Sequence, residues 1–346
     1  MVGISDETSS GRAPGNAFPS GLATAIGSLP HLDPSAAAAL VLRVIPELPA
    51  VPELPHLDAR ENMLARWLRA LSEVTVNADG SIVVDPDVDI DAPFDYSLES
   101  TSHAGLLAFI DVALQQPRKP ARVKAQLTGP LTLGVALVEA GVPAEIAFDR
   151  ATRLSRGWAR TIENLFRTQL PDTELLLFFD EPSLVLWDDD DPPVDHDKAT
   201  DALSGALAGV GCRTGIHVCG KADPRIALAA GPDVLGLEVS TRFLEDAPGL
   251  ARFLDAGGFI AWGAVPTDRP VGESHAPLWR ALVELWCELT RRGCDGLRLR
   301  SQAMITPACG LAGHGVIQAE LALSLAHELA DRVFDQAVAT KLTVGA

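Results

Sequence analysis

The sequence is poor in positive charge. Its 346 residues include 28 Lys and Arg against 46 Asp and Glu, which gives a formal net charge of -18 and an isoelectric point near 4.8. Proteins that follow a phosphate backbone carry clustered Lys and Arg on their surface. The composition therefore argues against a nucleic-acid partner and against other polyanionic ligands.

Long apolar runs are also lacking. No run reaches the roughly 18 residues that a membrane-spanning helix requires. The opening stretch MVGISDETSSGRAPGN has neither the basic nor the apolar region of a secretory signal. We therefore expect a cytoplasmic protein that makes no membrane contact and begins with a flexible N-terminus over residues 1–18.

Cysteine is scarce. The 5 cysteines form an odd set without tight spacing, at positions 212, 219, 287, 294 and 309. This set argues against a disulfide framework, and cysteines with a functional role would be metal ligands or nucleophiles. Cys287 lies in the amphipathic stretch LWRALVELWCEL, Cys212 opens a strand-like run and Cys294 follows a turn, so we expect these three to be structural.

Short apolar runs alternate with longer helical patterns along most of the chain. The runs predict eight strands, over residues 23–28, 48–52, 122–128, 174–180, 212–218, 234–239, 258–264 and 297–305. Most are continuously apolar, as expected for parallel strands that are covered on both faces. The repeated strand-then-helix unit predicts an α/β protein, a single (β/α)8 TIM barrel over residues 19–346.

One segment interrupts this alternation. The stretch VTVNADGSIVV, residues 74–84, alternates in polarity around a turn of Asn, Ala, Asp and Gly. This pattern predicts a β-hairpin, inserted after the second strand of the barrel.

Polar and reactive side chains gather at the ends of the predicted strands. Active sites of such barrels lie at the C-terminal ends of the strands. The reactive residues at these ends are Ser28, Glu53, Asp180, Glu181, His217, Cys219, Glu238 and Cys309. We therefore expect them to surround one site.

His217 and Cys219 are spaced to bind one metal ion, since residues two apart on a strand face the same side. Taken alone, this pair is better explained by core packing. Glu238, costly to bury unpaired in LGLEVS, and Cys309 at another strand end change that balance. One nitrogen, two thiolates and one carboxylate make a tetrahedral set suited to Zn²⁺.

A zinc ion with these ligands carries a formal charge of about -1, which makes it a weak Lewis acid. It would bind a substrate thiol, lower the pKa of that thiol and leave the thiolate nucleophilic, so the predicted reaction is alkyl transfer to sulfur. A purely structural zinc is the alternative, and the spread of the ligands over three strand ends argues against it.

A thiol substrate that is also an amino acid would need partners for its charged groups. Asp180 in FFDEPSL and Glu53 in VPELP could pair with the α-ammonium, and the turn at residues 26–28 could offer backbone N–H groups to the α-carboxylate. The alternative role of the Asp180–Glu181–Pro182 stretch is helix capping.

Six segments together carry a family resemblance. The stretches IGSLP, QLTGPLTL, FFDEPSL, HVCG, LEVS and ITPACGL occur in this order between about residues 23 and 335. They resemble the C-terminal catalytic barrel of cobalamin-independent methionine synthase. The wider superfamily includes uroporphyrinogen decarboxylase and the corrinoid-dependent coenzyme M methyltransferases.

The resemblance implies a function and roles for individual residues. It implies a methyltransferase that forms methionine from homocysteine, with zinc held by His217, Cys219, Glu238 and Cys309. Homocysteine would be held by the turn Ile26, Gly27 and Ser28 and by Asp180, which is also the expected catalytic residue, with Glu53 beside them.

Two departures from the family's pattern concern the methyl donor. The chain has no room for the additional N-terminal barrel of long members, so it resembles the short, core-only type. The segment FIAWGAVPT also lacks the histidine that the family uses to protonate departing folate. Methylcobalamin or a corrinoid protein, which leaves without needing a proton, therefore fits better as the donor than methyltetrahydrofolate.

Three alternatives to this function remain. The same zinc chemistry could serve another thiol acceptor, or a barrel without catalytic activity could bind metal or thiol. Uroporphyrinogen decarboxylase is disfavoured because it needs basic groups for a polycarboxylate and has no use for a His–Cys pair with a distant Cys.

Overall fold

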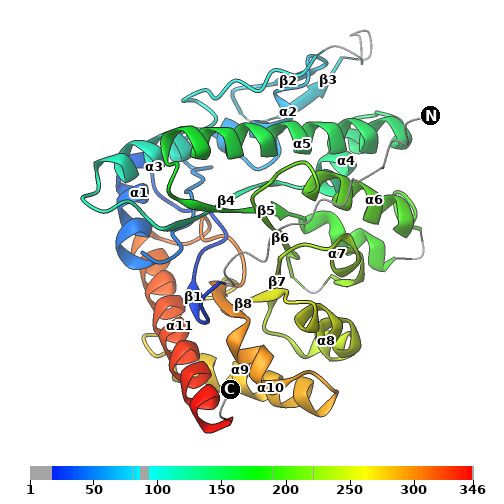
Figure 1. Cartoon of the computed structure of the whole chain (residues 1–346). Coiled ribbons are helices and arrows are strands. Elements are labelled where there is room, and N and C mark those ends of the chain that lie inside the picture. Colours follow the sequence, from blue (N-terminus) through cyan, green and yellow to red (C-terminus); the bar gives the residue numbers. More distant parts are fainter. Residues whose placement is uncertain (1–17, 80, 86–92, 190, 221, 345–346) are drawn as a thin grey trace, which may run out of the picture.

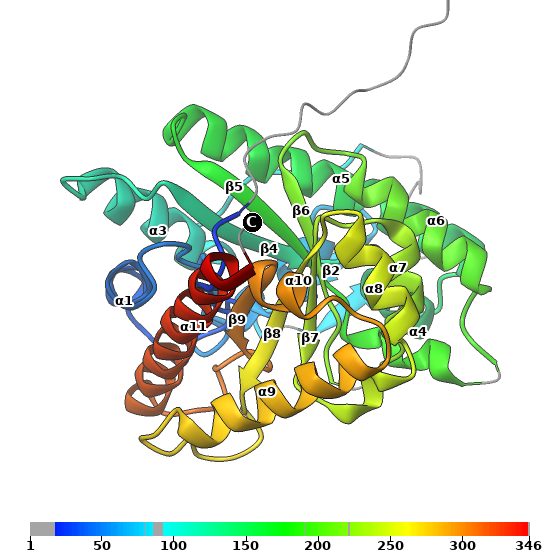
Figure 2. The same cartoon turned by 60° about the horizontal axis from the view of Figure 1, so that its bottom comes forward.

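The centre of the molecule is a curled parallel β-sheet surrounded by helices (Figures 1 and 2). The computed structural model describes residues 18–79, 81–85, 93–189, 191–220 and 222–344. The seven strands are β1 (Leu22–Ala23), β4 (Arg122–Thr128), β5 (Glu174–Asp180), β6 (Arg213–His217), β7 (Val234–Glu238), β8 (Phe259–Val265) and β9 (Ala303–Pro307). Their order is β1-β9-β8-β7-β6-β5-β4, with every neighbouring pair parallel.

Helices connect the strands and cover the outside of the sheet. They are α1 (Pro34–Val44), α2 (Ala65–Leu68), α3 (Ala104–Gln115), α4 (Pro130–Glu139), α5 (Ala144–Gln169), α6 (His196–Leu207), α7 (Arg225–Ala230), α8 (Ala247–Asp255), α9 (Ala276–Arg291), α10 (Gly296–Ser301) and α11 (Val316–Val344). Three short 3-10 helices are η1 (Ala59–Glu61), η2 (Pro182–Asp188) and η3 (Thr241–Leu244). The expected α/β class is thus confirmed, with a curled parallel sheet of seven strands among the described residues, whereas the complete (β/α)8 barrel stays a prediction.

Two apolar cores lie on opposite faces of the strands. Along β5, Leu175, Leu177 and Phe179 pack in the large core under the helices, whereas Leu176 and Phe178 belong to a second, smaller core. The smaller core is built from residues of the five strands β1, β5, β7, β8 and β9 and from Phe18 and Leu48. Because side chains alternate along a strand, this smaller core lies inside the curl of the sheet.

The two edges of the sheet are joined by an extended segment. Val51 N–H donates to the Lys124 carbonyl on β4 at 2.8 Å, and Glu53 N–H donates to the Gly27 carbonyl after β1 at 3.0 Å. Residues 48–52, predicted as a strand, form only isolated bridges here. The prediction of a regular strand was wrong because Pro49 and Pro52 have no N–H to give to a ladder.

Two other strand boundaries differ from prediction. Residues 297–305 were expected to be one strand, but α10 occupies Gly296–Ser301 and β9 begins only at Ala303. Asp295 caps this short helix by accepting hydrogen bonds from the N–H groups of Leu297 and Arg298. An N-cap residue favours a helix here, although the alternating LRLR pattern that follows is typical of a strand. Strand β1 is also shorter than predicted, because the chain turns at Gly27.

The segment 74–84 forms an antiparallel pair of short strands, β2 (Val74–Val76) and β3 (Ile82–Val84), with Val74 opposite Val84. In the view of Figure 1, these two strands lie above α5. Its place as an insertion in an eight-stranded barrel stays a prediction. Of the predicted flexible N-terminus, residues 1–17 lie outside the described residues.

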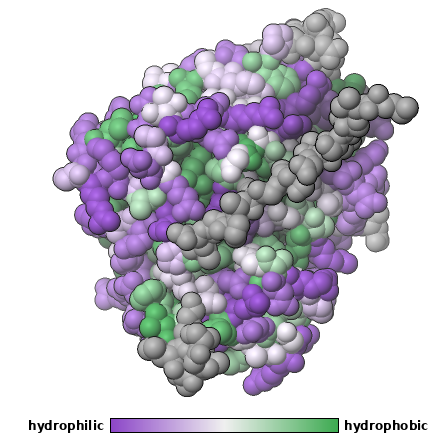
Figure 3. All heavy atoms as spheres, viewed as in Figure 1, coloured by the Kyte–Doolittle hydropathy of each residue, from purple (hydrophilic) through white to green (hydrophobic). Residues whose placement is uncertain are grey.

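Polar side chains cover much of the molecular surface shown in Figure 3, which is consistent with an aqueous environment on that face. Among the described residues, no helix combines the length and apolar composition needed to cross a bilayer.

A buried ion pair fastens the chain just before β2 to helix α5. The Arg150 guanidinium donates from Nε to Glu73 Oε1 at 2.9 Å, and both side chains are buried. The same guanidinium lies 4.6 Å from the centre of the Phe94 ring. Removing one partner of such a pair leaves the other charge buried without compensation.

We predict that Arg150→Met lowers the free energy of unfolding by about 3–5 kcal/mol, measured by urea denaturation, because Glu73 would keep a buried charge. Arg153→Met on the same helix removes an exposed pair with Asp149 and should cost less than about 0.5 kcal/mol. Equal losses of unfolding free energy in the two variants would show that the buried pair stabilises the fold no more than the exposed pair does.

Candidate metal and thiol site

Three of the predicted metal ligands converge at the C-terminal ends of β6 and β9. His217 is the last residue of β6, Cys219 follows two residues later, and Cys309 lies just beyond β9. One ligand atom from each of these residues lies within 4.8 Å of the other two. The two sulfur atoms are 3.4 Å apart.

The surroundings of His217 suit a metal ligand. Its Nε2 atom is buried and has no hydrogen-bond partner, which is costly for a polar atom unless something binds there. Gly236 is the neighbour of His217 on β7, and a Cβ at that glycine would lie 3.1 Å from Nδ1. One imidazole nitrogen and two sulfurs from rigid strand ends fit Zn²⁺.

The two thiols of this group differ in their acidity. Cys219 hydrogen-bonds with Cys309, and this bond and burial raise the pKa of the Cys219 thiol. The pKa of the Cys309 thiol is lowered by the same bond and by the neighbouring His217. A thiolate is the form of cysteine that binds metal.

Glu238, the fourth predicted ligand, ends β7 as expected but does not belong to the group of three. Its negative charge is among the causes that raise the pKa of Cys219, so it lies in the same electrostatic neighbourhood. Its role as a zinc ligand stays a prediction.

Asp180 lies at the end of β5 and pairs in register with His217. It is buried, and its Oδ1 atom has no hydrogen-bond partner. Burial raises the pKa of this carboxyl, while the charges of Lys124 and His217 lower it. An unpartnered buried carboxylate oxygen beside a thiol site is a suitable acceptor for a bound cation such as an ammonium group.

Glu53 lies opposite Ser28 in the extended segment that joins the sheet edges. Its Oε1 atom is 2.9 Å from Nη1 of Arg66, and both side chains are nearly inaccessible to solvent. Burial raises the pKa of Glu53, and the nearby Arg66 charge lowers it.

The turn Ile26–Gly27–Ser28 depends on two close approaches that only glycine permits. Gly27 has φ of 142°, and a Cβ there would lie 2.1 Å from Nε2 of Gln126. A Cβ on Gly310, the residue after Cys309, would lie 1.9 Å from Ser28 Oγ. The turn and the metal ligand Cys309 are therefore in direct proximity.

A cavity of about 260 Å³ collects most of these groups. The predicted site residues that line it are Ile26, Ser28, Glu53, Asp180, His217, Cys219 and Cys309. Gly27 and Glu238 are not among its lining residues. Seven of the nine predicted site residues thus line one pocket at the C-terminal ends of the strands, where barrel enzymes carry their active sites.

Glu181 has a structural role. Its carboxylate accepts from the N–H groups of Leu131 and Thr132 and from the Thr132 hydroxyl, at 2.7 to 2.8 Å. It therefore caps the N-terminus of α4, the alternative considered for this stretch. Burial raises the pKa of Glu181 to about 7.

Several residues in and near the pocket were missed in the sequence. Glu61, Asn62 and Met63 line one wall, and Glu61 holds that wall by accepting from the N–H of Leu54 at 2.6 Å. Lys124 is buried beneath the turn at residues 26–28. A signal for Lys124 was present, since a lysine in a strand buried on both faces needs a partner.

The end of β8 offers no acid to the pocket. Trp262 is fully buried and packs edge-on against Trp286 of α9, with ring centres 6.4 Å apart. Gly263 has no side chain, and a Cβ there would lie 2.8 Å from Cα of Ala308. A side chain at position 263 would therefore clash with the backbone of Ala308.

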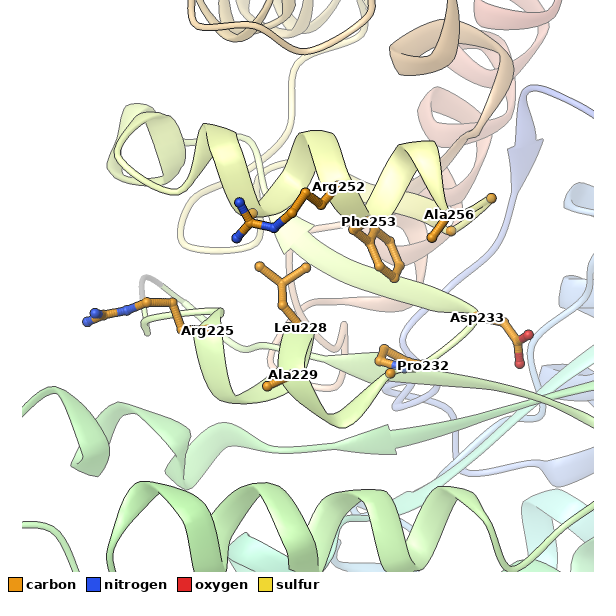
Figure 4. Close-up of a pocket in the computed structure, with 12 residues that line it drawn as sticks. Arg225, Leu228, Ala229, Pro232, Asp233, Arg252, Phe253 and Ala256 are labelled. Atoms are coloured by element: carbon orange, nitrogen blue, oxygen red, sulfur yellow. The ribbon is translucent and has the colours of Figure 1, made fainter.

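A larger hollow, of about 660 Å³, lies between α7 and α8 (Figure 4). Leu228 and Phe253 lie between the two helices, whereas the Arg225 and Arg252 side chains extend away from them. None of the predicted site residues lines it, and Asp233 places it near the opposite, N-terminal end of β7. This hollow lacks the chemistry of the pocket described above.

Neither protein-family models nor curated proteins match the sequence. Solved structures do match the fold. A B12-independent methionine synthase from Shewanella sp. W3-18-1, in complex with selenomethionine, superposes with a TM-score of 0.63 at 14% identity, over 92% of this chain and 99% of that chain. A methyltransferase from Methanosarcina mazei gives a TM-score of 0.55 at 14% identity, over 91% and 95% of the two chains. The resemblance seen in the sequence motifs is thus confirmed at the level of the fold.

We predict that Cys219→Ser and Cys309→Ser each reduce the zinc content of purified protein from about one ion per chain to a small fraction, because each removes a thiolate ligand. Elemental analysis by mass spectrometry measures this directly. The control is Cys287→Ser, which alters an exposed thiol on α9 and should retain zinc. Undiminished zinc in both ligand variants would exclude this group as the metal site.

Proposed function

We propose that this protein is a zinc-dependent methyltransferase that transfers a methyl group to the thiol of homocysteine to form methionine. One observation carries the proposal: a His–Cys–Cys group and two buried carboxylates line the same small pocket. The similarity in fold to a methionine synthase and a methyltransferase supports the same reaction class.

The metal end of the pocket would activate the acceptor. His217, Cys219 and Cys309 would hold zinc, with Glu238 approaching from the end of β7 as a fourth ligand. When bound, zinc supplies the lowered pKa of a coordinated thiol, which keeps the acceptor as a nucleophilic thiolate near neutral pH. Because two thiolates already reduce the charge of the ion, this site is better suited to a thiol than to making hydroxide.

Groups next to the metal ligands would hold the amino-acid part of the acceptor. Asp180, beside His217, presents an unpartnered carboxylate oxygen, and Glu53 lines the same cavity. These two groups would bind the α-ammonium, and the turn Ile26–Ser28 would receive the α-carboxylate. Holding both charged groups would aim the sulfur toward the metal ligands and reduce the entropy cost of the reaction.

The donor is proposed to be methylcobalamin or a corrinoid protein. Methyltetrahydrofolate needs protonation at its leaving nitrogen, and the end of β8 carries Trp262 and Gly263 in place of an acid. A corrinoid leaves without needing a proton. The strongly acidic composition also disfavours a polyglutamate tail on a folate donor.

The test incubates zinc-loaded protein with homocysteine and either methylcobalamin or methyltetrahydrofolate, and follows methionine by mass spectrometry. We predict turnover with methylcobalamin and none above background with the folate. A control reaction contains the Cys309→Ser variant, which should lose activity together with zinc. Turnover with folate alone would contradict the corrinoid assignment.

Two further outcomes would redirect the proposal. Methyl transfer to other thiols but not to homocysteine would retain the zinc chemistry and change the acceptor. Zinc and homocysteine binding without turnover for either donor would identify a binding protein in which catalysis has been lost.

A further inference from the structure

Lys124 is a buried cation inside the curl of the sheet. It lies on β4, only 1% of its surface is exposed, and its Nζ lies 4.9 Å from the centre of the Phe178 ring in the inner core. Lysine is almost never buried so completely unless it is paired. Its ammonium donates to the carbonyl oxygen of Ile26 and, at 3.1 Å, to Oε1 of Gln126.

The first of these bonds ties Lys124 to the proposed substrate turn. Ile26 begins the turn Ile26–Gly27–Ser28, and Gln126 packs directly under Gly27. Gln126 also donates from Nε2 to the Val51 carbonyl at 2.9 Å, on the segment that leads to Glu53. Lys124 and Gln126 therefore hold the turn and the Glu53 segment together from below.

Lys124 also balances the charge of the pocket. Its positive charge acts on both Asp180 and Glu53, and it is the largest of the charge effects that oppose burial at Asp180. Arg66 is the direct partner of Glu53 at 2.9 Å. Two buried carboxylates thus have two buried basic groups within electrostatic range, which reduces the cost of burying all four.

Resting on the proposed function, we propose that Lys124 is a positioning residue for the amino-acid part of the acceptor. Its ammonium fixes the Ile26–Ser28 turn through the Ile26 carbonyl and neutralises excess negative charge under Asp180 and Glu53. Lys124 does not line the cavity, so it acts through these groups and does not touch the substrate. The consequence is selectivity for a zwitterionic thiol, because the lining carboxylates would take the α-ammonium and the turn that Lys124 fixes would take the α-carboxylate.

The test compares the binding of two thiols to zinc-loaded protein by calorimetry. Homocysteine carries the α-ammonium and α-carboxylate, whereas 1-propanethiol offers the sulfur alone. We predict that Lys124→Met weakens homocysteine binding by roughly tenfold or more, since hydrogen bonds to charged groups are lost or misplaced. Propanethiol binding and zinc content should stay unchanged, because the metal ligands are not altered.

Arg122→Met is the matched control. Arg122 lies two residues earlier on the same strand, pairs with Glu174 at 3.1 Å and is remote from the cavity lining. This variant should bind both thiols as the wild type does. Lys124→Gln, which removes the charge but keeps a donor group, is the second variant, and it should show a smaller loss in the same direction.

The outcomes separate the two proposals. If wild-type protein binds homocysteine and Lys124→Met retains that affinity, or weakens for both thiols equally, the positioning role is wrong. Loss of folding or zinc in both Lys124 variants would assign the residue a structural role and would also overturn it. If zinc-loaded wild-type protein does not bind homocysteine at all, the proposed function itself fails.

Discussion

The parallel pairing of β5, β6 and β7 is the constraint on which the site depends. It places Asp180 beside His217 and His217 beside Gly236, so that a carboxylate, an imidazole and a closely approached glycine follow one another across three strands. Parallel strands end at the same edge of a sheet, and its curl brings Cys309, just beyond β9, close to His217 and Cys219 at the end of β6. A shift of one residue in any of these registers would point His217 into the helix layer instead of the pocket.

Burying carboxylates in this arrangement costs free energy, which the surrounding residues offset. Two acids at the base of the pocket are buried in a low-dielectric interior, where unpaired charge is strongly unfavourable. Arg66 and Lys124 supply opposite charge, and Gly27 and Gly310 allow the backbone to approach within contact distance. These buried residues therefore hold in place the few side chains that line the cavity. Such support is typical of binding sites whose geometry is fixed before the ligand arrives.

The sequence was sufficient to predict the parts that follow from short-range patterns. Continuous apolar runs indicated the central strands β4 to β8, and the residues after them indicated the metal group, because strand ends in a parallel sheet share one edge. The segment at 48–52 and the helix at 296–301 were missed, since prolines and an N-cap override an apolar or alternating pattern locally.

The burial partners in the pocket could not be predicted in the same way. The contact of Arg66 with Glu53 and that of Lys124 with Ile26 join residues that are far apart in the sequence or share no motif, so only the folded chain reveals them.

Glu238 shows how far a prediction from strand ends reaches. A carboxylate at a strand end predicts proximity to the metal group, but the 4.8 Å group itself contains only His217, Cys219 and Cys309.

The central claim is that this site binds zinc through two cysteines and then accepts a substrate thiol. X-ray absorption spectroscopy at the zinc edge tests it directly, because it counts sulfur neighbours at about 2.3 Å from the metal. The account predicts two sulfur ligands in the zinc-loaded protein, from Cys219 and Cys309, and a third after homocysteine is added. A sulfur count that does not change on adding homocysteine would contradict it.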